Sequence, residues 1–197
     1  MNITRLNVHR IQTCPMPIFI ENFSWMIVNL GLAFLAVILG FLYLYFRQPV
    51  LKVLLFILWI LFFPNTIYLI TDIQYLPQQW IKVDSSIQPL LLIQYAVLTI
   101  VGVLTYFAGF KPIESLFKNA KVKKQTQKLI LIGINLVIAF AVILGKVERT
   151  NSWYVFTQPE RVIKDIEKML TSPSLIALTI LFAIMINLIY LPFRKRF

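Results

Sequence analysis

Two short polar segments in an otherwise apolar chain carry the residues that could do chemistry. The first contains Asn65, Tyr68 and Asp72, which are spaced so that they share one face of a helix. Pro64 precedes them and removes a backbone hydrogen bond, so we expect a kink there. The second is KVERTNSW (146–153), which contains two cations and a carboxylate. A carboxylate beside such cations could act as a general base next to a clamp for phosphate or carboxylate groups.

We expect these two segments to meet in one site. Arg149 or Lys146 is the expected partner of Asp72, and Glu148 could complete a network. The candidate catalytic residues are Asp72, Glu148 and Arg149. The candidate binding residues are the polar and aromatic side chains of both segments: Asn65, Tyr68, Asp72, Lys146, Arg149, Asn151 and Trp153.

The composition indicates a membrane protein. Of 197 residues, 59% are hydrophobic and only 14% are charged, which is too little charge for the surface of a soluble domain of this length. Apolar runs long enough to cross a hydrocarbon core of about 30 Å recur along the chain. The sequence predicts an all-α transmembrane helix bundle formed by a single domain, 23–197, after a polar tail, 1–22. The predicted spans are 23–46, 50–70, 89–110, 129–145 and 174–191.

Polar features outside the two segments are expected to be structural. Each predicted span carries one amide side chain that could bond to another helix: Asn29, Asn65, Gln94, Asn135 and Asn187. Residues 158–170 form an amphipathic pattern that predicts an interfacial helix on the outer side. The sequence leaves open whether this helix covers the two polar segments.

Few residues could bind a metal or a cofactor. The chain has one cysteine, Cys14, and one histidine, His9, so the usual zinc, haem and iron–sulfur ligand sets cannot form. We therefore expect no metal site and no cofactor. The formal net charge of +11 is better explained by membrane topology than by binding to nucleic acid.

The distribution of lysine and arginine predicts the orientation. With five spans, the side that holds the C-terminus and loop 111–128 has 11 of these residues, against 8 on the other side. We therefore expect the C-terminus in the cytoplasm and the N-terminus, loop 71–88 and loop 146–173 outside. The lysine-rich loop has two interpretations. It either only enforces topology or also binds anionic lipid head groups, at Lys118, Lys121, Lys123 and Lys124.

The polar segments resemble a known family. FFPNTIYLITD (62–72) and LGKVERTNSWYVF (144–156) resemble the two signatures of a bacterial multi-pass membrane-protein family, domain of unknown function 1361. The sequence departs from the family pattern at Lys146, where arginine is usual, at Tyr154, where an acid is usual, and at Tyr75, where histidine is frequent. The last two departures weaken the case for a metal or acid–base site. The resemblance implies a bacterial cytoplasmic membrane protein and covers about 50–190, but implies no activity. The signature residues present here are Pro64, Asn65, Tyr68, Thr71 and Asp72, then Gly145, Arg149, Asn151, Ser152 and Trp153.

Three functions fit these features. The first is a structural or accessory subunit whose outer polar network packs helices or docks a protein partner, which includes a second copy of the chain. The second is a membrane enzyme that acts on a lipid-linked or envelope substrate at a carboxylate–arginine site. The third is a transporter of small solutes or lipids, in which the kinked second span is the gate. No inverted repeat is visible in the sequence to support that transporter hypothesis.

Overall fold

The protein is a bundle of helices. The computed structural model describes residues 16–194, and these residues contain no strand. Five segments are long and apolar enough to cross a membrane: Ile18–Tyr45, Pro49–Trp80, Gln88–Asn119, Lys124–Val147 and Pro173–Phe193. The predicted all-α transmembrane bundle is therefore confirmed. Residues 1–15 of the predicted tail lie outside the described residues.

The first helix is longer than predicted. Helix α1 (Met16–Tyr45) begins within the stretch 1–22 that was expected to be a surface tail. Residues 16–22 belong to the bundle because Ile18 and Phe19 pack against a hydrophobic cluster and Asn22 is buried. A polar residue such as Asn22 is tolerated there only because other side chains hydrogen-bond to it.

The second span is broken at the predicted place. Helix α2 (Pro49–Phe62) ends before Pro64, and α3 (Pro64–Thr71) begins at it. Two side chains satisfy carbonyl groups at the break: the Asn65 amide donates to the Phe62 carbonyl at 2.9 Å, and the Thr66 hydroxyl donates to the Phe63 carbonyl at 2.8 Å. In a membrane, such internal partners allow proline to interrupt a helix without leaving backbone groups unpaired.

Helical structure continues into two predicted loops. The 3-10 helix η1 (Asp72–Tyr75) and α4 (Leu76–Trp80) extend the second span into loop 71–88. After α5 (Gln88–Gly109), α6 (Lys111–Asn119) occupies the first part of the predicted loop 111–128. Proline at the second position of α4 and of α6 suits these helix starts, because its missing N–H is not needed there.

The remaining helices form the second half of the molecule. They are α7 (Lys124–Val147), the short α8 (Tyr154–Thr157), α9 (Pro159–Thr171) and α10 (Pro173–Phe193). The predicted interfacial helix 158–170 corresponds to α9.

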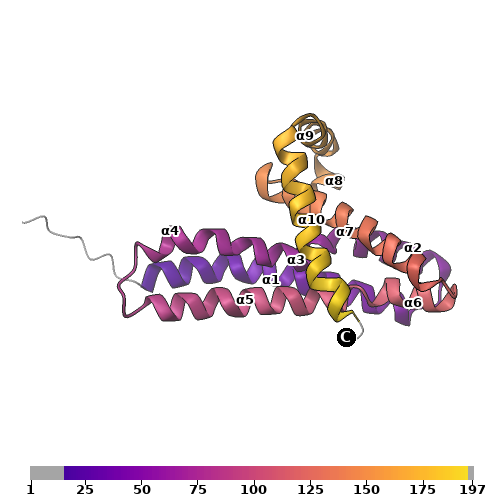
Figure 1. Ribbon diagram of the computed structural model, residues 1–197, viewed down its shortest axis with the longest axis horizontal. Coiled ribbons are helices and arrows are strands. Elements are labelled where there is room, and N and C mark those ends of the chain that lie inside the picture. Colours follow the sequence, from indigo (N-terminus) through magenta and orange to yellow (C-terminus); the bar gives the residue numbers. More distant parts are fainter. Residues whose placement is uncertain (1–15, 195–197) are drawn as a thin grey trace, which may run out of the picture.

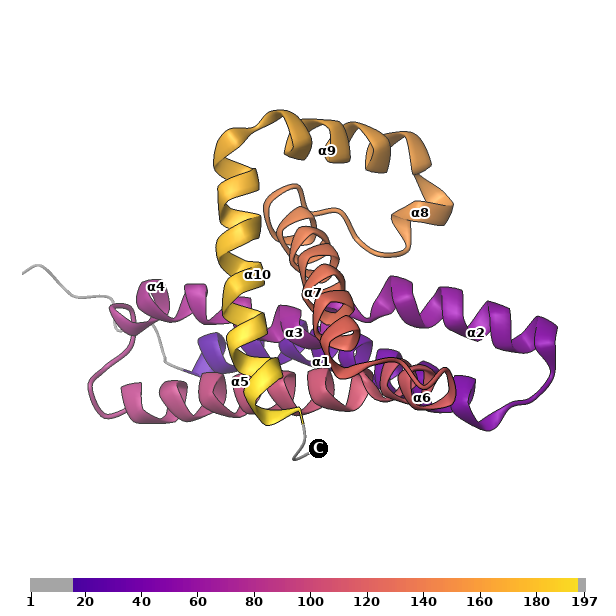
Figure 2. The same cartoon turned by 45° about the vertical axis from the view of Figure 1, so that its right-hand side comes forward.

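The helices are arranged around α1, α3 and α5, which lie side by side (Figure 1). Helices α7 and α10 pack on each other, and α10 crosses the α1–α3–α5 layer at a steep angle in both views (Figures 1 and 2). Helix α9 lies beyond the ends of α7 and α10 (Figure 2).

An aromatic core joins the two halves. The ring of Phe63 stacks on Trp59, with centroids 5.1 Å apart, and meets Phe110 edge-on at 4.9 Å. Tyr190 of α10 stacks on Phe110 at 4.0 Å. The Trp59 indole N–H donates to the Gly109 carbonyl at 3.1 Å. Rings in these arrangements contribute more than their buried area alone, so the break at Pro64 is held by packing on both sides.

Candidate functional site

The centre of the candidate site is an ion pair between Asp72 and Lys146. The Lys146 ammonium lies 2.7 Å from one carboxylate oxygen of Asp72, and the two side chains are only 8% and 1% exposed. The second carboxylate oxygen accepts a hydrogen bond from the Asn29 amide at 3.0 Å. Since these residues come from α7, from the end of α3 and from α1, one buried carboxylate ties three helices together.

Two tyrosine rings enclose the lysine. The Lys146 ammonium lies 4.8 Å from the centroid of the Tyr68 ring and 4.5 Å from that of Tyr75. A desolvated ammonium over aromatic faces gains cation–π attraction, worth on the order of 2 kcal/mol. The tyrosines therefore replace part of the hydration that this cation loses when it is buried.

Of the two cations expected to pair with Asp72, the structure shows Lys146, and it corrects the expected role of Glu148. Within residues 16–194, Arg149 forms no ion pair and is not the partner of Asp72. Helix α7 ends at Val147, so Lys146 still points from the helix toward α3, whereas Arg149 follows in a left-handed conformation with φ 55° and is exposed. Glu148 does not join the Asp72 network either, because it pairs with Lys168 of α9 at 2.7 Å.

The two polar segments meet at a cavity next to the ion pair. This cavity (the Asn65 cavity) has a volume of about 290 Å³, and Asn65, Tyr68 and Asn151 are among its lining residues. Asn65 donates a hydrogen bond to the hydroxyl of Ser152 at 3.2 Å. Trp153, another candidate binding residue, does not line the cavity and is exposed. Most of the lining is apolar, and the polar groups within it are neutral amides and hydroxyl groups.

Helix α9 forms one wall of the Asn65 cavity. Val162 and Ile166 on its apolar side are lining residues. The Thr150 hydroxyl donates to the Asp165 carboxylate at 2.5 Å, and Met169 is buried against α7 and α10. Helix α9 thus covers part of the two polar segments, a point that the sequence left open.

The sequence did not predict one polar cluster, and of a second it predicted only that its amide side chains could bond to other helices. Asn22 and Gln79 exchange two amide hydrogen bonds of 2.7 Å, and the Tyr95 hydroxyl donates to Gln79 at 3.1 Å. Further along the bundle, Asn135 accepts from the Tyr106 hydroxyl at 2.6 Å and donates to Asn187 at 2.9 Å. These bonds connect α1, α4 and α5 in the first cluster and α5, α7 and α10 in the second.

A second ion pair lies at the opposite end of the bundle. Arg194 donates to both carboxylate oxygens of Glu114 at 2.6 Å and also to the side-chain oxygen of Gln127. The hydrogen bond to Glu114 raises the pKa of Arg194 above its ordinary value, which is already high, so this residue stays charged. The pair fastens the end of α10 to α6.

The geometry favours holding helices together over acid–base chemistry. Each oxygen of Asp72 accepts one hydrogen bond and almost no surface of the residue is exposed, so the carboxylate is not presented to a substrate. Within the described part of the chain, no three side chains of His, Cys, Asp or Glu come together as a metal site requires. The Asn65 cavity can bind a polar group through hydrogen bonds, and no charged residue is among its lining residues.

Comparison with known proteins places both polar segments inside one protein family. No curated protein matches the chain, and no solved structure does. One family model matches residues 28–189, which include both segments and all five apolar helices in whole or in large part. The chain belongs to the family described as proteins of unknown function (DUF1361).

Proposed function

We propose that this integral membrane protein has a structural or accessory role, in which the Asp72–Lys146 network holds α1, α3 and α7 in register. The observation that supports the proposal is that Lys146 and Asn29 each bind one oxygen of the buried Asp72 carboxylate. A buried ion pair with a further hydrogen bond is costly to break and suits a role in setting helix register. The Asn65 cavity beside it is then where a protein partner docks.

A carboxylate–arginine enzyme and a transporter of polar solutes both need features that the described residues do not supply. A carboxylate–arginine enzyme needs Arg149 beside a free carboxylate, whereas Asp72 pairs with Lys146 and Glu148 pairs with Lys168. A transporter of polar solutes needs a polar path past Pro64. The next cavity toward the lysine-rich end is instead lined by apolar side chains such as Ile134.

The first test compares Asp72→Asn with Asp84→Asn. Asp84 is exposed in the turn before α5, so its replacement is a matched control. Asp72→Asn should lower the folded yield and the melting temperature in mild detergent, because it leaves the buried Lys146 without its counter-ion. The loss should be partial, since Tyr68 and Tyr75 still contact the cation. Size-exclusion chromatography after heating measures both quantities. Equal melting temperatures for the two variants would contradict the structural role.

We also propose that the chain lies in a bacterial cytoplasmic membrane, with the Asp72 end outside. The charge distribution supports this orientation. Single cysteines introduced in a Cys14→Ser background should report it. Lys82→Cys and Lys164→Cys, both at exposed positions, should react with an impermeant maleimide in intact cells, and Lys121→Cys only after the membrane is opened. The reverse labelling pattern would require the opposite orientation.

A further inference from the structure

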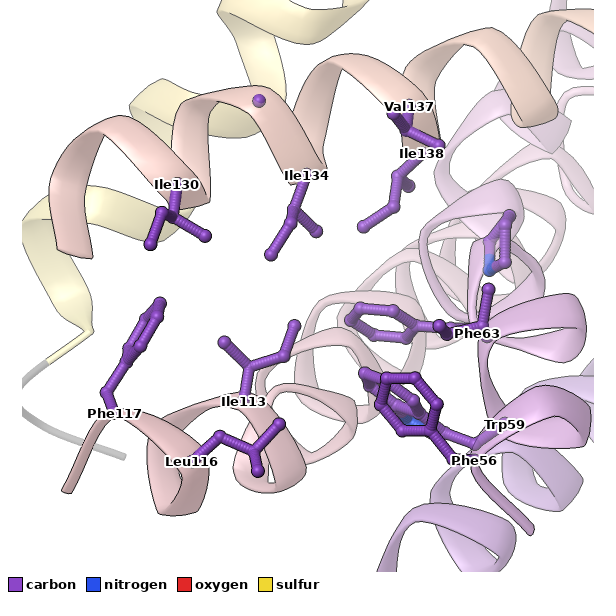
Figure 3. A pocket seen from close by; sticks show the side chains of 13 residues that line it. Phe56, Trp59, Phe63, Ile113, Leu116, Phe117, Ile130, Ile134, Val137 and Ile138 are labelled. Carbon is purple, nitrogen blue, oxygen red and sulfur yellow. The ribbon is translucent and has the colours of Figure 1, made fainter. Parts of the chain in front are cut away.

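A second cavity, larger than the Asn65 cavity, lies toward the end of the bundle that is far from Asp72. It has a volume of about 550 Å³ and lies between α2, α6 and α7. Figure 3 shows Ile130, Ile134 and Val137 of α7 facing the side chains of α6 and the aromatic rings at the end of α2. Its size lies in the range of small-molecule sites, but such sites usually contain several polar groups. The only side-chain nitrogen in its lining is that of Trp59, which already donates to Gly109.

Gly133 keeps this cavity open. It lies on the same face of α7 as Ile130, Ile134 and Val137, and a Cβ added to it would meet no atom within 4 Å. Glycine is unfavourable inside a helix by about 1 kcal/mol relative to alanine. At this position it therefore leaves space that the chain's own side chains do not fill.

The cavity is nearly as long as the hydrocarbon part of one leaflet is thick. Its α7 wall runs from Ile130 to Ile138, which is about 12 Å at a rise of 1.5 Å per residue. One leaflet provides about half of the 30 Å hydrocarbon core. Ile130 and Phe117 lie at one end of the cavity, and Phe63 and Val137 lie toward the other (Figure 3).

The end of the cavity near Phe117 adjoins a strongly basic segment. This segment, residues 118–128, runs from the end of α6 through the turn into the start of α7. It contains no acidic residue. Its lysines are all exposed and form no ion pair within the described part of the chain: Lys118, Lys121, Lys123, Lys124 and Lys128. The nearby Glu114 is occupied by Arg194. The positive charge of this segment is thus available to an external anion.

We propose that this cavity and the lysine segment 118–128 together form a binding site for an anionic phospholipid. One acyl chain fills the apolar cavity up to the level of Phe63, and the phosphate lies among the lysines at its end. The apolar lining and the length of the cavity suit an acyl chain. The uncompensated positive charge at one end suits the phosphate of the head group. The site is independent of the Asp72–Lys146 network, which lies at the other end of α7.

The fluorescence of Trp59 provides a direct probe, because this residue lines the cavity. The other three tryptophans are replaced by phenylalanine: Trp25, Trp80 and Trp153. The protein is reconstituted in phosphatidylcholine vesicles and titrated with phosphatidylglycerol or phosphatidylcholine that carries brominated chains. Brominated phosphatidylglycerol should quench Trp59 at a several-fold lower mole fraction than brominated phosphatidylcholine. Equal quenching by the two lipids would overturn the proposal. This test needs no substitution in the proposed site.

The cavity is tested with Gly133→Leu and the control Gly31→Leu. Gly31 is also an exposed glycine in a helix with nothing within 4 Å of an added Cβ, but it does not line the cavity. Gly133→Leu should lower quenching by both brominated lipids and remove one phosphatidylglycerol from the complex in native mass spectrometry. Gly31→Leu should change neither result. Identical behaviour of the two variants would exclude the cavity as the chain site.

The head-group site is tested with Lys123→Gln/Lys124→Gln and the control Lys82→Gln/Lys164→Gln. All four lysines are exposed, and the control pair lies at the other end of the bundle. The first pair should weaken phosphatidylglycerol binding by about fivefold to thirtyfold and leave phosphatidylcholine quenching unchanged, since each lysine near an anionic phosphate contributes on the order of a tenfold change or less. Equal losses in both double variants would show a general effect of charge and contradict a defined site.

Discussion

Lys146→Met should destabilise the protein more than any other single replacement of a charged residue in it. Methionine retains much of the apolar stem of lysine but removes the ammonium that lies 2.7 Å from Asp72. The carboxylate would then stay buried with only the Asn29 amide as a partner. Removing one partner of a buried ion pair costs on the order of 3–5 kcal/mol. The free energy of unfolding, measured by titration from mild detergent into a denaturing detergent, should fall by that amount.

Arg149→Met is the matched control for this measurement. It removes a cation three residues away, at an exposed position that forms no ion pair with Asp72. The free energy of unfolding should change by less than about 0.5 kcal/mol, as is usual for surface substitutions. If Arg149→Met were the more damaging variant, the Asp72 partner would be misassigned.

Gly109→Ala should have the second-largest effect. A Cβ added at Gly109 would lie 2.5 Å and 2.8 Å from two ring carbons of Phe63. The Phe63 ring cannot move away easily, because it is buried between Trp59, Tyr106 and Phe110. Overpacking of this kind costs about 1–3 kcal/mol. The same unfolding titration should show a loss in this range.

Gly31→Ala is the control for the change of residue type. An added Cβ at Gly31 meets no atom within 4 Å, so only the helix propensity changes. Alanine is favoured over glycine inside a helix by about 1 kcal/mol. This variant should be as stable as the natural protein or more stable. A similar loss at both positions would indicate that the close approach of Phe63 to Gly109 is not what limits stability.

The bundle could be predicted from the sequence because long apolar runs have few alternatives in a membrane. Backbone groups must be satisfied within each span, so each run becomes a helix. The break at Pro64 followed from its missing N–H. The helix starts were harder to predict, since the polar Asn22 looked like part of a tail. Its burial depends on Gln79, a residue 57 positions away in a stretch expected to be a loop.

The candidate site was predicted in outline, but its contacts were not. Asp72 was expected to have a cation from the second polar segment, and the choice between Lys146 and Arg149 depended on where α7 ends. Helix ends are uncertain by one or two residues, and here that margin decides which side chain faces α3. Asn29 was one of several amides of equal standing, so its selection by Asp72 required the three-dimensional packing. Gly133 gave no signal, because its role is the space beside it.

The most direct test of the structural role is a double-mutant cycle with Asp72→Asn, Lys146→Met and the two combined. Each variant is measured in the same unfolding titration. If the two side chains stabilise the bundle through each other, the double variant should be about as stable as Lys146→Met alone, with a coupling energy of at least about 1 kcal/mol. Additive losses, or single variants with unchanged stability, would contradict the central role of the Asp72–Lys146 pair in holding the helices together.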